Sequence, residues 1–335
     1  MDIFICMNNL LLIMTYELDN LDKRILLELD RNSRISDVKL AKIIGKSKES
    51  VRYRIKRLTE EKIILGFTIW VDPTKLGYQT AKVYLNLANI PEKKKKLIGD
   101  LKNEKKLFWL GIADGEWNAG LTFFVKSNQE FFDLKNKLFS KYKDLIIESR
   151  TASLVSVHYH DKTFLHKENT NWGEMFRFPE NKTIDSISLK ILKDMLKNSR
   201  ISIVDISHNH KISIDIIRNR IKKLEEDKIL LKYTTIINYP KLGYEFYKTF
   251  LYFKNINNED MEKLMNYCLN NPNIVHFIKQ ISPWDIELEI MCENYEKYNK
   301  IISGLTENFS TIIKKVETAI MGEDYVFPSK KLVFE

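Results

Sequence analysis

The pentapeptide NSRIS occurs twice in this chain, at Asn32–Ser36 and again at Asn198–Ser202. The two copies lie 166 positions apart in a chain of 335 residues. Sliding the sequence against itself by that interval aligns Asp19–Tyr78 with Asp185–Tyr244 without a gap, and 24 of the 60 aligned positions are identical. A period of half the chain is too long for a solenoid, so the repeat indicates two tandem modules of several elements each.

The first part of each module has the pattern of three helices. In the first copy, apolar residues from Leu18 to Leu29 recur at helical spacing. Ser36 and Ser47 then stand where the N-caps of a second and a third helix are expected, with Gly45 in the turn between these helices. The stretch IILGFTIWVD that follows predicts a strand, a turn and a strand. Three helices and a hairpin predict a winged helix-turn-helix.

The outer face of the third predicted helix is basic in the first copy. Such a face can place side chains on phosphates and base edges in a major groove, although any solvated helix face is often rich in Lys and Arg. Nine of the eleven arginines lie in the two predicted winged helices, where their planar fork suits phosphate, guanine or an ion pair between helices. We expect ion pairs for Arg54 and Arg220. We expect DNA contacts from Arg34, Lys48, Arg52, Tyr53, Lys56 and Arg57, and from Arg218, Asn219 and Lys222 in the second copy.

The second copy presents a weaker basic face. Lys211 replaces the turn glycine, the preceding helix becomes polar at SHNHK, and Asp215 lies near the tip of the third helix. We therefore expect DNA to be read mainly by the first copy. The second copy either binds DNA with other preferences or serves as a structural partner.

Composition narrows the class of protein. The net charge is +9 and the pI is about 9.1, which suits a polyanionic partner. Cys6, Cys268 and Cys292 are scattered without CxxC spacing, which argues against a disulfide framework and a zinc site and suits a reducing cytosol. The apolar N-terminal stretch is too short to span a bilayer and lacks the features of a signal peptide. We expect a cytoplasmic protein without a membrane segment, in which folding begins near Tyr16.

After KLGY, each module has the order strand, helix, strand, strand, helix, strand. This order predicts an antiparallel sheet with helices on one face, a ferredoxin-like α+β layer. The predicted elements are residues 81–87, 91–103, 107–113, 117–125, 129–142 and 146–157, and in the second copy 247–253, 259–270, 275–281, 285–291, 295–308 and 312–320. The predicted organisation is an N-terminal extension (1–15), winged helix-turn-helix 1 (16–74), ferredoxin-like domain 1 (75–160), a linker (161–183), winged helix-turn-helix 2 (184–238) and ferredoxin-like domain 2 (239–335).

Taken together, the chain resembles the Lrp/AsnC (leucine-responsive, feast/famine) transcriptional regulators. The resemblance is carried by LDNLDKRILLEL, the NSRIS step, LAKIIGKSKESVRYRIKRL, VDPTKLGY, and the G-x-W-N and W-D turns with a Thr in the last strand. It implies an α+β fold in which each module is a winged helix-turn-helix followed by a βαββαβ ligand-binding and assembly domain. Ordinary members hold one copy, whereas this chain holds two in tandem.

The resemblance also implies partners. The third helix would read the major groove of double-stranded DNA, which adds Ser47 and Ser50 to the expected contacts. The ferredoxin-like sheets would pair, forming a pseudo-dimer within the chain and a homo-oligomer between chains. An amino acid or another small-molecule effector would bind near the turns of the sheet. The candidate effector residues are Gly111, Asp114, Gly115, Trp117, Asn118, Trp284 and Asp285.

Two other classes of function compete with a DNA-binding regulator. Some Lrp-like proteins are haem-pathway enzymes, similar to sirohaem decarboxylase, and the nearest candidates for their motif are His158, Tyr159 and His160. A second HxH, His208 and His210, lies in the polar second helix of the second copy. Because no nucleophile, carboxylate pair, phosphate loop or metal cluster has the required spacing, we expect no enzyme, no catalytic residues, no cofactor and no metal. A regulator that acts by protein contacts without DNA is the remaining alternative.

Overall fold

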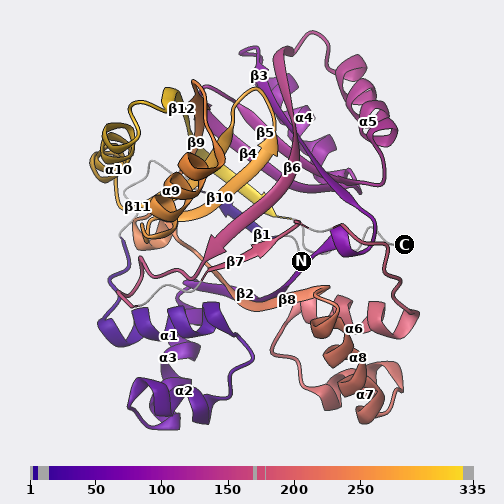
Figure 1. Cartoon of the computed structure of the whole chain (residues 1–335). Helices are drawn as coiled ribbons and strands as arrows, with labels where there is room; N and C mark the ends of the chain where they lie inside the picture. The colour runs from indigo at the N-terminus through magenta and orange to yellow at the C-terminus, as the bar shows by residue number, and fades with distance from the viewer. Residues whose placement is uncertain (1–2, 7–14, 169–171, 178, 327–335) are drawn as a thin grey trace.

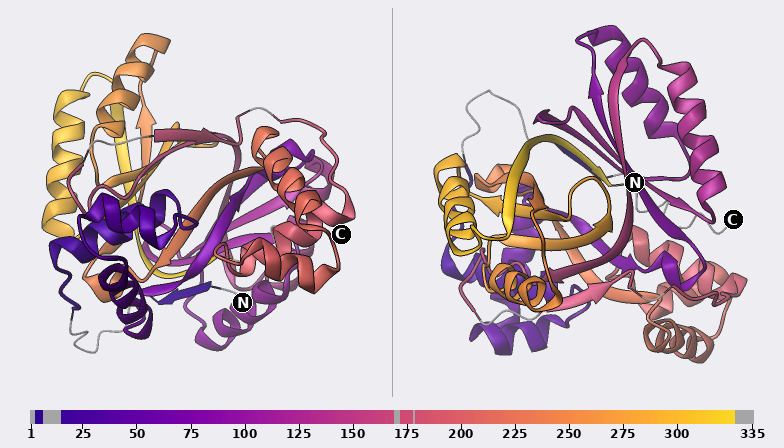
Figure 2. Two further views of the ribbon diagram at one scale, coloured as in Figure 1. Left: turned by 90° about the horizontal axis from the view of Figure 1, so that it is seen from below. Right: turned by 45° about the horizontal axis from the view of Figure 1, so that its top comes forward.

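The computed structural model of the chain describes residues 3–6, 15–168, 172–177 and 179–326. Figure 1 shows a β-barrel with helices on its outer flanks, and below it two separate three-helix units. Seen from below in Figure 2, the two units lie on either side of strands that run between them. None of the described helices is both long and apolar enough to cross a membrane.

Each three-helix unit is a helix-turn-helix that forms at the expected positions. The first unit comprises α1 (Asn20–Arg31), α2 (Asp37–Ile44) and α3 (Lys48–Glu60), and the second comprises α6 (Ser186–Lys197), α7 (Ile203–His210) and α8 (Ile214–Glu226). The N-caps predicted at Ser36 and Ser47 are confirmed, since each hydroxyl group accepts a hydrogen bond from the backbone N–H three residues on. Ser202 caps the equivalent helix of the second copy in the same way.

The prediction of a hairpin after the third helix is wrong. Residues Ile64–Val71 form one unbroken strand, β2, which pairs antiparallel with β8 (Leu230–Ile237) of the other copy. Thr68 lies opposite Thr234, its own counterpart in the repeat, so the ladder is centred on a pseudo-twofold axis. Gly66 does not interrupt the strand, and β8 of the second copy supplies hydrogen-bonding partners for its backbone.

The two NSRIS steps meet across this ladder. The Arg34 guanidinium donates to the backbone carbonyls of Ser199 and Ile201, at 2.5 and 2.8 Å. In return, Arg200 donates to the Ser33 carbonyl at 2.9 Å, and the hydroxyl groups of Ser33 and Ser199 lie 2.5 Å apart. The pentapeptide is therefore a clasp that joins the two helix-turn-helix units, which explains why both copies keep it.

The ferredoxin-like domains match the predicted order closely. The first contains β3 (Gln79–Leu87), α4 (Pro91–Asn103), β4 (Leu107–Gly115), β5 (Ala119–Val125), α5 (Asn128–Lys141) and β6 (Ile146–His160). The second contains β9 (Glu245–Phe253), α9 (Asn258–Leu269), β10 (Ile274–Ile281), β11 (Ile286–Cys292), α10 (Tyr295–Asn308) and β12 (Ile313–Val326).

The two four-stranded sheets close into one eight-stranded barrel. Strand β6 pairs with β10, and β12 pairs with β4, so the last strand of each copy joins the second strand of the other. Helices α4 and α5 cover one outer flank and α9 and α10 the other (Figure 1). The sheet pairing that the resemblance implied between subunits is thus made inside a single chain.

The segments outside the two modules also have structure. Strand β1 (Ile3–Cys6) pairs with β12, ahead of the point near Tyr16 where we expected folding to begin. In the predicted linker, β7 (Trp172–Met175) pairs with β6, and Asp161, Lys162 and Leu165 are buried. Phe178, also in the predicted linker, lies outside the described residues. Short 3₁₀ turns at Pro73–Lys75 and Pro240–Leu242 follow β2 and β8.

The turn before the third helix of each unit allows a matched stability experiment. Gly45 ends α2 with φ 72°, and Lys211 ends α7 with φ 54°, both in the left-handed region. Because a side chain at such φ costs about 1 kcal/mol, we expect Lys211→Gly to raise the free energy of unfolding by about that amount. Gly45→Ala, which meets open space, should lower it similarly. Urea denaturation measures both, and a destabilised Lys211→Gly variant would contradict the strain argument.

Candidate functional site

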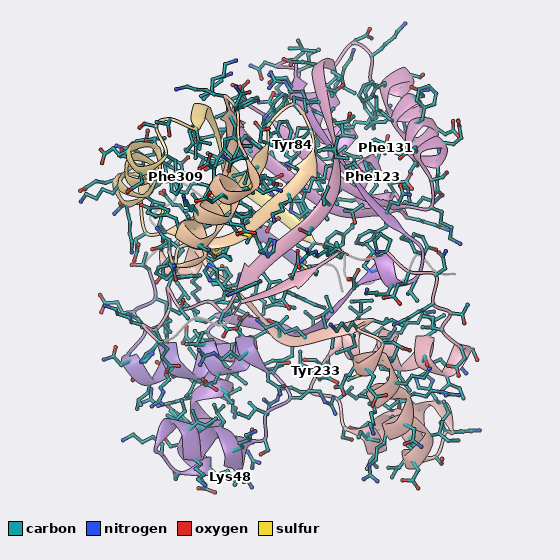
Figure 3. All side chains as sticks on the ribbon, in the orientation of Figure 1. Lys48, Tyr84, Phe123, Phe131, Tyr233 and Phe309 are labelled. Atoms are coloured by element: carbon teal, nitrogen blue, oxygen red, sulfur yellow. The ribbon has the colours of Figure 1, made fainter. Side chains whose placement is uncertain are left out.

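The exposed face of α3 lies at the end of the molecule farthest from the barrel, where Figure 3 labels Lys48. Arg52, Tyr53 and Lys56 lie on the same helix and are also exposed, with 66%, 64% and 75% of the surface of these side chains open to solvent. Ser47 caps the helix, and Ser50 is half-buried. Among the described residues, Lys48 pairs with no carboxylate, whereas Arg52 reaches Asp37 at 3.2 Å.

Most of the other arginines are engaged inside the protein. The buried carboxylate of Asp22 accepts from Arg54 at 2.8 Å and from Arg57 at 2.5 Å, which fastens α3 to α1. Arg220 pairs with Asp185 at 2.7 Å, and Arg34 lies in the clasp. The ion pairs expected for Arg54 and Arg220 are present. Arg34 and Arg57, which we expected on DNA, have structural partners that sequence spacing did not indicate.

The corresponding face of α8 has as many ion pairs as that of α3, where Lys56 also pairs with Glu60 at 3.7 Å, but Ile214 stands where the first copy has Lys48. Arg218 pairs with Asp215 at 3.3 Å and Lys222 with Glu226 at 3.6 Å. Asn219 is exposed where the first copy has Tyr53. His210, in the preceding helix, contacts Asp194 at 2.8 Å, and His208 is exposed. The basic surface expected of the first copy is therefore less developed in the second.

The candidate effector residues lie at turns of the barrel and do not gather into one pocket. Trp117 and Trp284 are buried, with ring centroids 6.4 Å apart. The side chains of Asn118 and Asp285 accept hydrogen bonds from the backbone N–H of Leu87 and Phe253, at 2.8 and 2.7 Å. Asp114 and Gly115 are exposed, and Gly111 packs under the Trp109 ring. An effector site at these positions stays a prediction.

Aromatic rings fill one part of the barrel. Tyr84 meets Phe250, its counterpart in the repeat, at 5.3 Å, and both rings pack on Trp284 at 5.1 and 4.7 Å. Trp117 also lies against Tyr84, at 6.2 Å. The pseudo-twofold axis runs between these pairs, and Figure 3 labels Tyr84 within the barrel.

Beside the aromatic rings lies a buried charge cluster centred on Glu287. Its carboxylate accepts from Lys82 at 2.9 Å, from Lys248 at 2.8 Å and from the Tyr84 hydroxyl at 2.7 Å. Burial alone would raise the pKa of Glu287, but the ammonium groups of Lys248 and Lys82 outweigh it and lower that pKa to about 2. Lys248 also pairs with Glu289, whose other oxygen lies 2.5 Å from Nδ1 of His276. The cluster joins β3 and β9 to β11.

The remaining space in the barrel is a cavity of about 250 Å³. All eight barrel strands line it, together with Trp70 and Val71 of β2, Lys162, and Met175 and Phe176 near β7. Its polar groups include Thr80, Lys162, His276 and Asp324. We did not single out this cavity from the sequence. A signal was present, because charged residues interrupt otherwise apolar strands at AKVYLNL and IELEIMC.

The histidines of the HYH motif do not line this cavity. His158 contacts Glu174 at 3.2 Å and packs on Trp172 and Phe277, beside β7. His160 is buried, and burial lowers its pKa to about 4. Tyr159, between them, points the other way and packs on Trp70 at 4.8 Å. In the described part of the chain, no group of three or more metal-ligating side chains could hold a metal ion.

Comparison with known proteins identifies the family. Residues 18–59 match the AsnC-type helix-turn-helix domain. The chain is 32% identical over 121 residues to the HTH-type transcriptional regulator LrpA of Pyrococcus abyssi, covering 85% of that protein and 36% of this chain. It is 35% identical over 102 residues to the HTH-type transcriptional regulator Ptr1 of Methanocaldococcus jannaschii, covering 68% of that protein and 30% of this chain. The chain belongs to the Lrp/AsnC family of transcriptional regulators.

Solved structures correct the expectation that this Lrp/AsnC protein is not an enzyme. The structure of the siroheme decarboxylase NirDL matches with a TM-score of 0.64 at 11% identity, covering 94% of this chain and 97% of that one. NirDL in co-complex with an iron-uroporphyrin III analogue matches with a TM-score of 0.63 at 10% identity, over the same shares. An enzyme thus has this fold over nearly the whole chain, and the absence of a familiar catalytic motif was not a sufficient reason to exclude catalysis.

The cavity wall gives a pH-dependent prediction. Burial raises the pKa of Asp324 to about 6, although the indole N–H of Trp109 donates to it. The pKa of the Asp324 carboxyl is thus higher in the folded protein than the value of about 3.9 in the unfolded chain, so ionisation of this group opposes folding. At low pH ionisation does not lower the free energy of unfolding, and above pH 6 it lowers it by the full amount.

We therefore expect Asp324→Asn to raise the free energy of unfolding by up to about 3 kcal/mol at pH 8, and by less than about 1 kcal/mol at pH 4. Urea denaturation of both proteins across this pH range measures the difference. A difference that does not change with pH would contradict a buried, ionising carboxyl at this position.

Proposed function

We propose that the protein is a transcriptional regulator that binds double-stranded DNA in the cytoplasm, mainly through α3. The observation that carries this proposal is the set of exposed side chains on that helix, Lys48, Arg52, Tyr53 and Lys56, of which Lys48 lies far from the barrel (Figure 3). Lysine and arginine at these positions suit phosphates and guanine edges, and Ser47 and Ser50 begin the helix where a backbone phosphate would lie.

The second helix-turn-helix unit would also contact the DNA, but with a weaker positive charge. Its exposed Arg218, Asn219 and Lys222 would add phosphate contacts, but Ile214 replaces the cation Lys48, which makes the positive field weaker. The clasp between the NSRIS steps fixes the two units relative to each other, so both would meet one duplex without the cost of ordering a flexible linker. A small-molecule effector would then act on a preformed pair of units, and a homo-oligomer would form through the ferredoxin-like domains.

The repeat supplies a matched mutational test. We expect Arg52→Ala combined with Lys56→Ala to weaken binding to duplex DNA by at least about tenfold, since each position contributes a phosphate or base contact. Arg218→Ala combined with Lys222→Ala, at the equivalent positions of the second copy, should weaken it less. Anisotropy titrations of genomic fragments at two salt concentrations measure affinity and salt slope. No binding by the wild type at ~50 mM salt would refute the proposal.

A second candidate is an enzyme that acts on an acidic tetrapyrrole, as siroheme decarboxylase NirDL does. Two observations favour it: the likeness of fold along the whole chain, and the presence in the cavity of Lys162 beside Lys82 and Lys248, the last two being paired with Glu287. The substrate of such an enzyme carries several carboxylates, which lysines can bind. The rim formed by β2 and β7 would have to open, because the cavity is smaller than the 300–1,000 Å³ typical of ligand pockets.

This candidate predicts a visible signal. When an iron-uroporphyrin is added to the purified protein, the absorption spectrum of the porphyrin should change, because the ring moves from water into an apolar site. The change should saturate at one porphyrin per chain. Incubation with sirohaem should then release carbon dioxide, measured by trapping and mass spectrometry. An unchanged spectrum at tens of micromolar protein would exclude the enzyme candidate and leave the regulator.

A further inference from the structure

One carboxylate connects the clasp of the two helix-turn-helix units to the exposed face of α3. Asp37, the first residue of α2, accepts from Arg200 of the second copy through Oδ1 at 2.8 Å. Its other oxygen, Oδ2, accepts from Nε of Arg52 on α3 at 3.2 Å. Arg200 also donates to the backbone carbonyl of Ser33, at 2.9 Å. A continuous set of hydrogen bonds therefore runs from the second copy to an exposed arginine of the first.

We propose that Asp37 is a positioning residue for base recognition. Arg200 holds Asp37 across the clasp, and Asp37 fixes the guanidinium of Arg52 so that this side chain reads one guanine. The second copy thus sets the sequence specificity of the first without touching that base. The inference rests on the proposed function, since Arg52 reads a base only if α3 binds DNA.

The geometry of Arg52 suits an end-on contact with guanine. Asp37 engages its Nε, and within the described part of the chain its two terminal nitrogens meet no acceptor. The N–H groups on these terminal nitrogens form the fork that pairs with O6 and N7 of guanine. A carboxylate on Nε leaves this fork free while it restricts the rotamers of the side chain. Less conformational freedom then has to be lost when DNA binds.

Stability does not account for the contact between Asp37 and Arg52. Exposed ion pairs contribute little to stability, and α3 is already fastened to α1 by the pairs of Arg54 and Arg57 with Asp22. Affinity does not account for it either, because a negative charge 3.2 Å from a proposed DNA contact repels phosphate. Orientation of the guanidinium is the effect that this carboxylate is placed to supply.

The clasp is asymmetric at this point. Ile203 stands in the second copy where the first has Asp37. Arg34, the counterpart of Arg200, donates to two backbone carbonyls of the other unit. Arg200 divides its donors between one carbonyl and the Asp37 carboxylate. The two arginines therefore have different roles, although the pentapeptides that contain them are identical.

The arginines on the two exposed helix faces are also held differently. Arg218 of α8 pairs with Asp215, three residues earlier on its own helix. Arg52 has Glu49 at the same spacing but contacts Asp37 of α2 instead. The side chain of Asp215 is 86% exposed and that of Asp37 is 18% exposed. Only Arg52 has a partner that is itself held in place by a second contact.

The first test measures sequence discrimination by the full-length protein. Selection from random duplexes gives the preferred site, and Arg52→Ala identifies the base pair that this side chain reads. We expect Asp37→Ala to reduce discrimination at that base pair by about fivefold to a hundredfold, the range for a bidentate contact with a base. Binding to non-specific DNA should become tighter, because a negative charge is lost.

A double-mutant cycle separates positioning from a general effect on the helix. Because Asp37 acts through Arg52, Asp37→Ala should cause no further loss of discrimination in a protein that already carries Arg52→Ala. The matched control is Asp215→Ala, which removes the partner of Arg218 and should leave discrimination at this base pair unchanged. Additive losses, or losses spread evenly over the whole site, would contradict a positioning role.

The clasp supplies a matched pair of variants that tests the second copy. Arg200→Met and Arg34→Met each remove two hydrogen bonds between the units. Only Arg200→Met should reduce discrimination at the base pair read by Arg52, because only Arg200 contacts Asp37. Equal losses in the two variants would show that the clasp merely joins the units, and would overturn the inference.

A measurement without DNA distinguishes the inference from the proposed function. The chain has eleven arginines, so the Nε–H signal of Arg52 in an NMR spectrum can be assigned by its loss in Arg52→Lys. We expect exchange of this proton with water to be several-fold faster in Asp37→Ala than in the wild type.

The outcomes are distinct. If the wild type binds no duplex, the proposed function fails, and the exchange rate still reports whether Asp37 holds Arg52. If the wild type binds DNA but Asp37→Ala keeps full discrimination, the proposed function stands and the inference is overturned. If Arg200→Met does not fold, discrimination and exchange in Asp37→Ala decide the matter, and an unchanged exchange rate would refute the contact.

Discussion

The barrel depends on one buried carboxylate. Glu287 is fully removed from solvent and is held between Lys82 and Lys248, each on the first strand of its own ferredoxin-like domain. Taking three charges out of water is expensive, so the cluster is tolerable only when all three members are in place with good geometry. The two sheets must therefore close on each other in one register. Aromatic rings pack beside the cluster, and the cavity occupies the space that remains.

The two copies have kept their shared framework and diverged in their chemistry. The NSRIS clasp and the β2–β8 ladder use equivalent residues from both halves, which is why they survived duplication together. The exposed basic face belongs mainly to the first copy, whose Asp30 also interacts electrostatically with Lys162 at the cavity. The carboxylates of the barrel belong to the second copy. Each half thus supplies groups that the other lacks.

Local signals in the sequence were sufficient for most of the fold. Caps such as Ser36 and Ser47 act within one turn of their own helix, and the βαββαβ pattern follows from periodicity and turn residues. The repeat predicted two equivalent modules. What could not be predicted was how the modules meet, because Thr68 of β2 pairs with Thr234 of β8, 166 residues further along the chain, and no local feature specifies that partner.

The same limit applies to the candidate sites. The exposed face of α3 was visible as a pattern, since exposure follows from helical spacing. Arg34 and Arg57 looked equivalent to Arg52 in sequence, but the structure gives them internal acceptors on Ser199 and Asp22. The cavity was missed because Lys82 and Glu287 lie 205 residues apart. A charged residue within an apolar strand signals a buried partner but does not identify it.

The asymmetry of the charge cluster has a consequence for how the halves recognise each other. Lys82 and Lys248 are equivalent in the repeat, but Gly120 and Thr122 stand where the second copy has Glu287 and Glu289. Two first halves would bury a pair of lysines with no counter-ion, and two second halves would bury four carboxylates around two lysines. As separate polypeptides, the halves would therefore select each other over themselves, and joining them in one chain supplies the two in equal number.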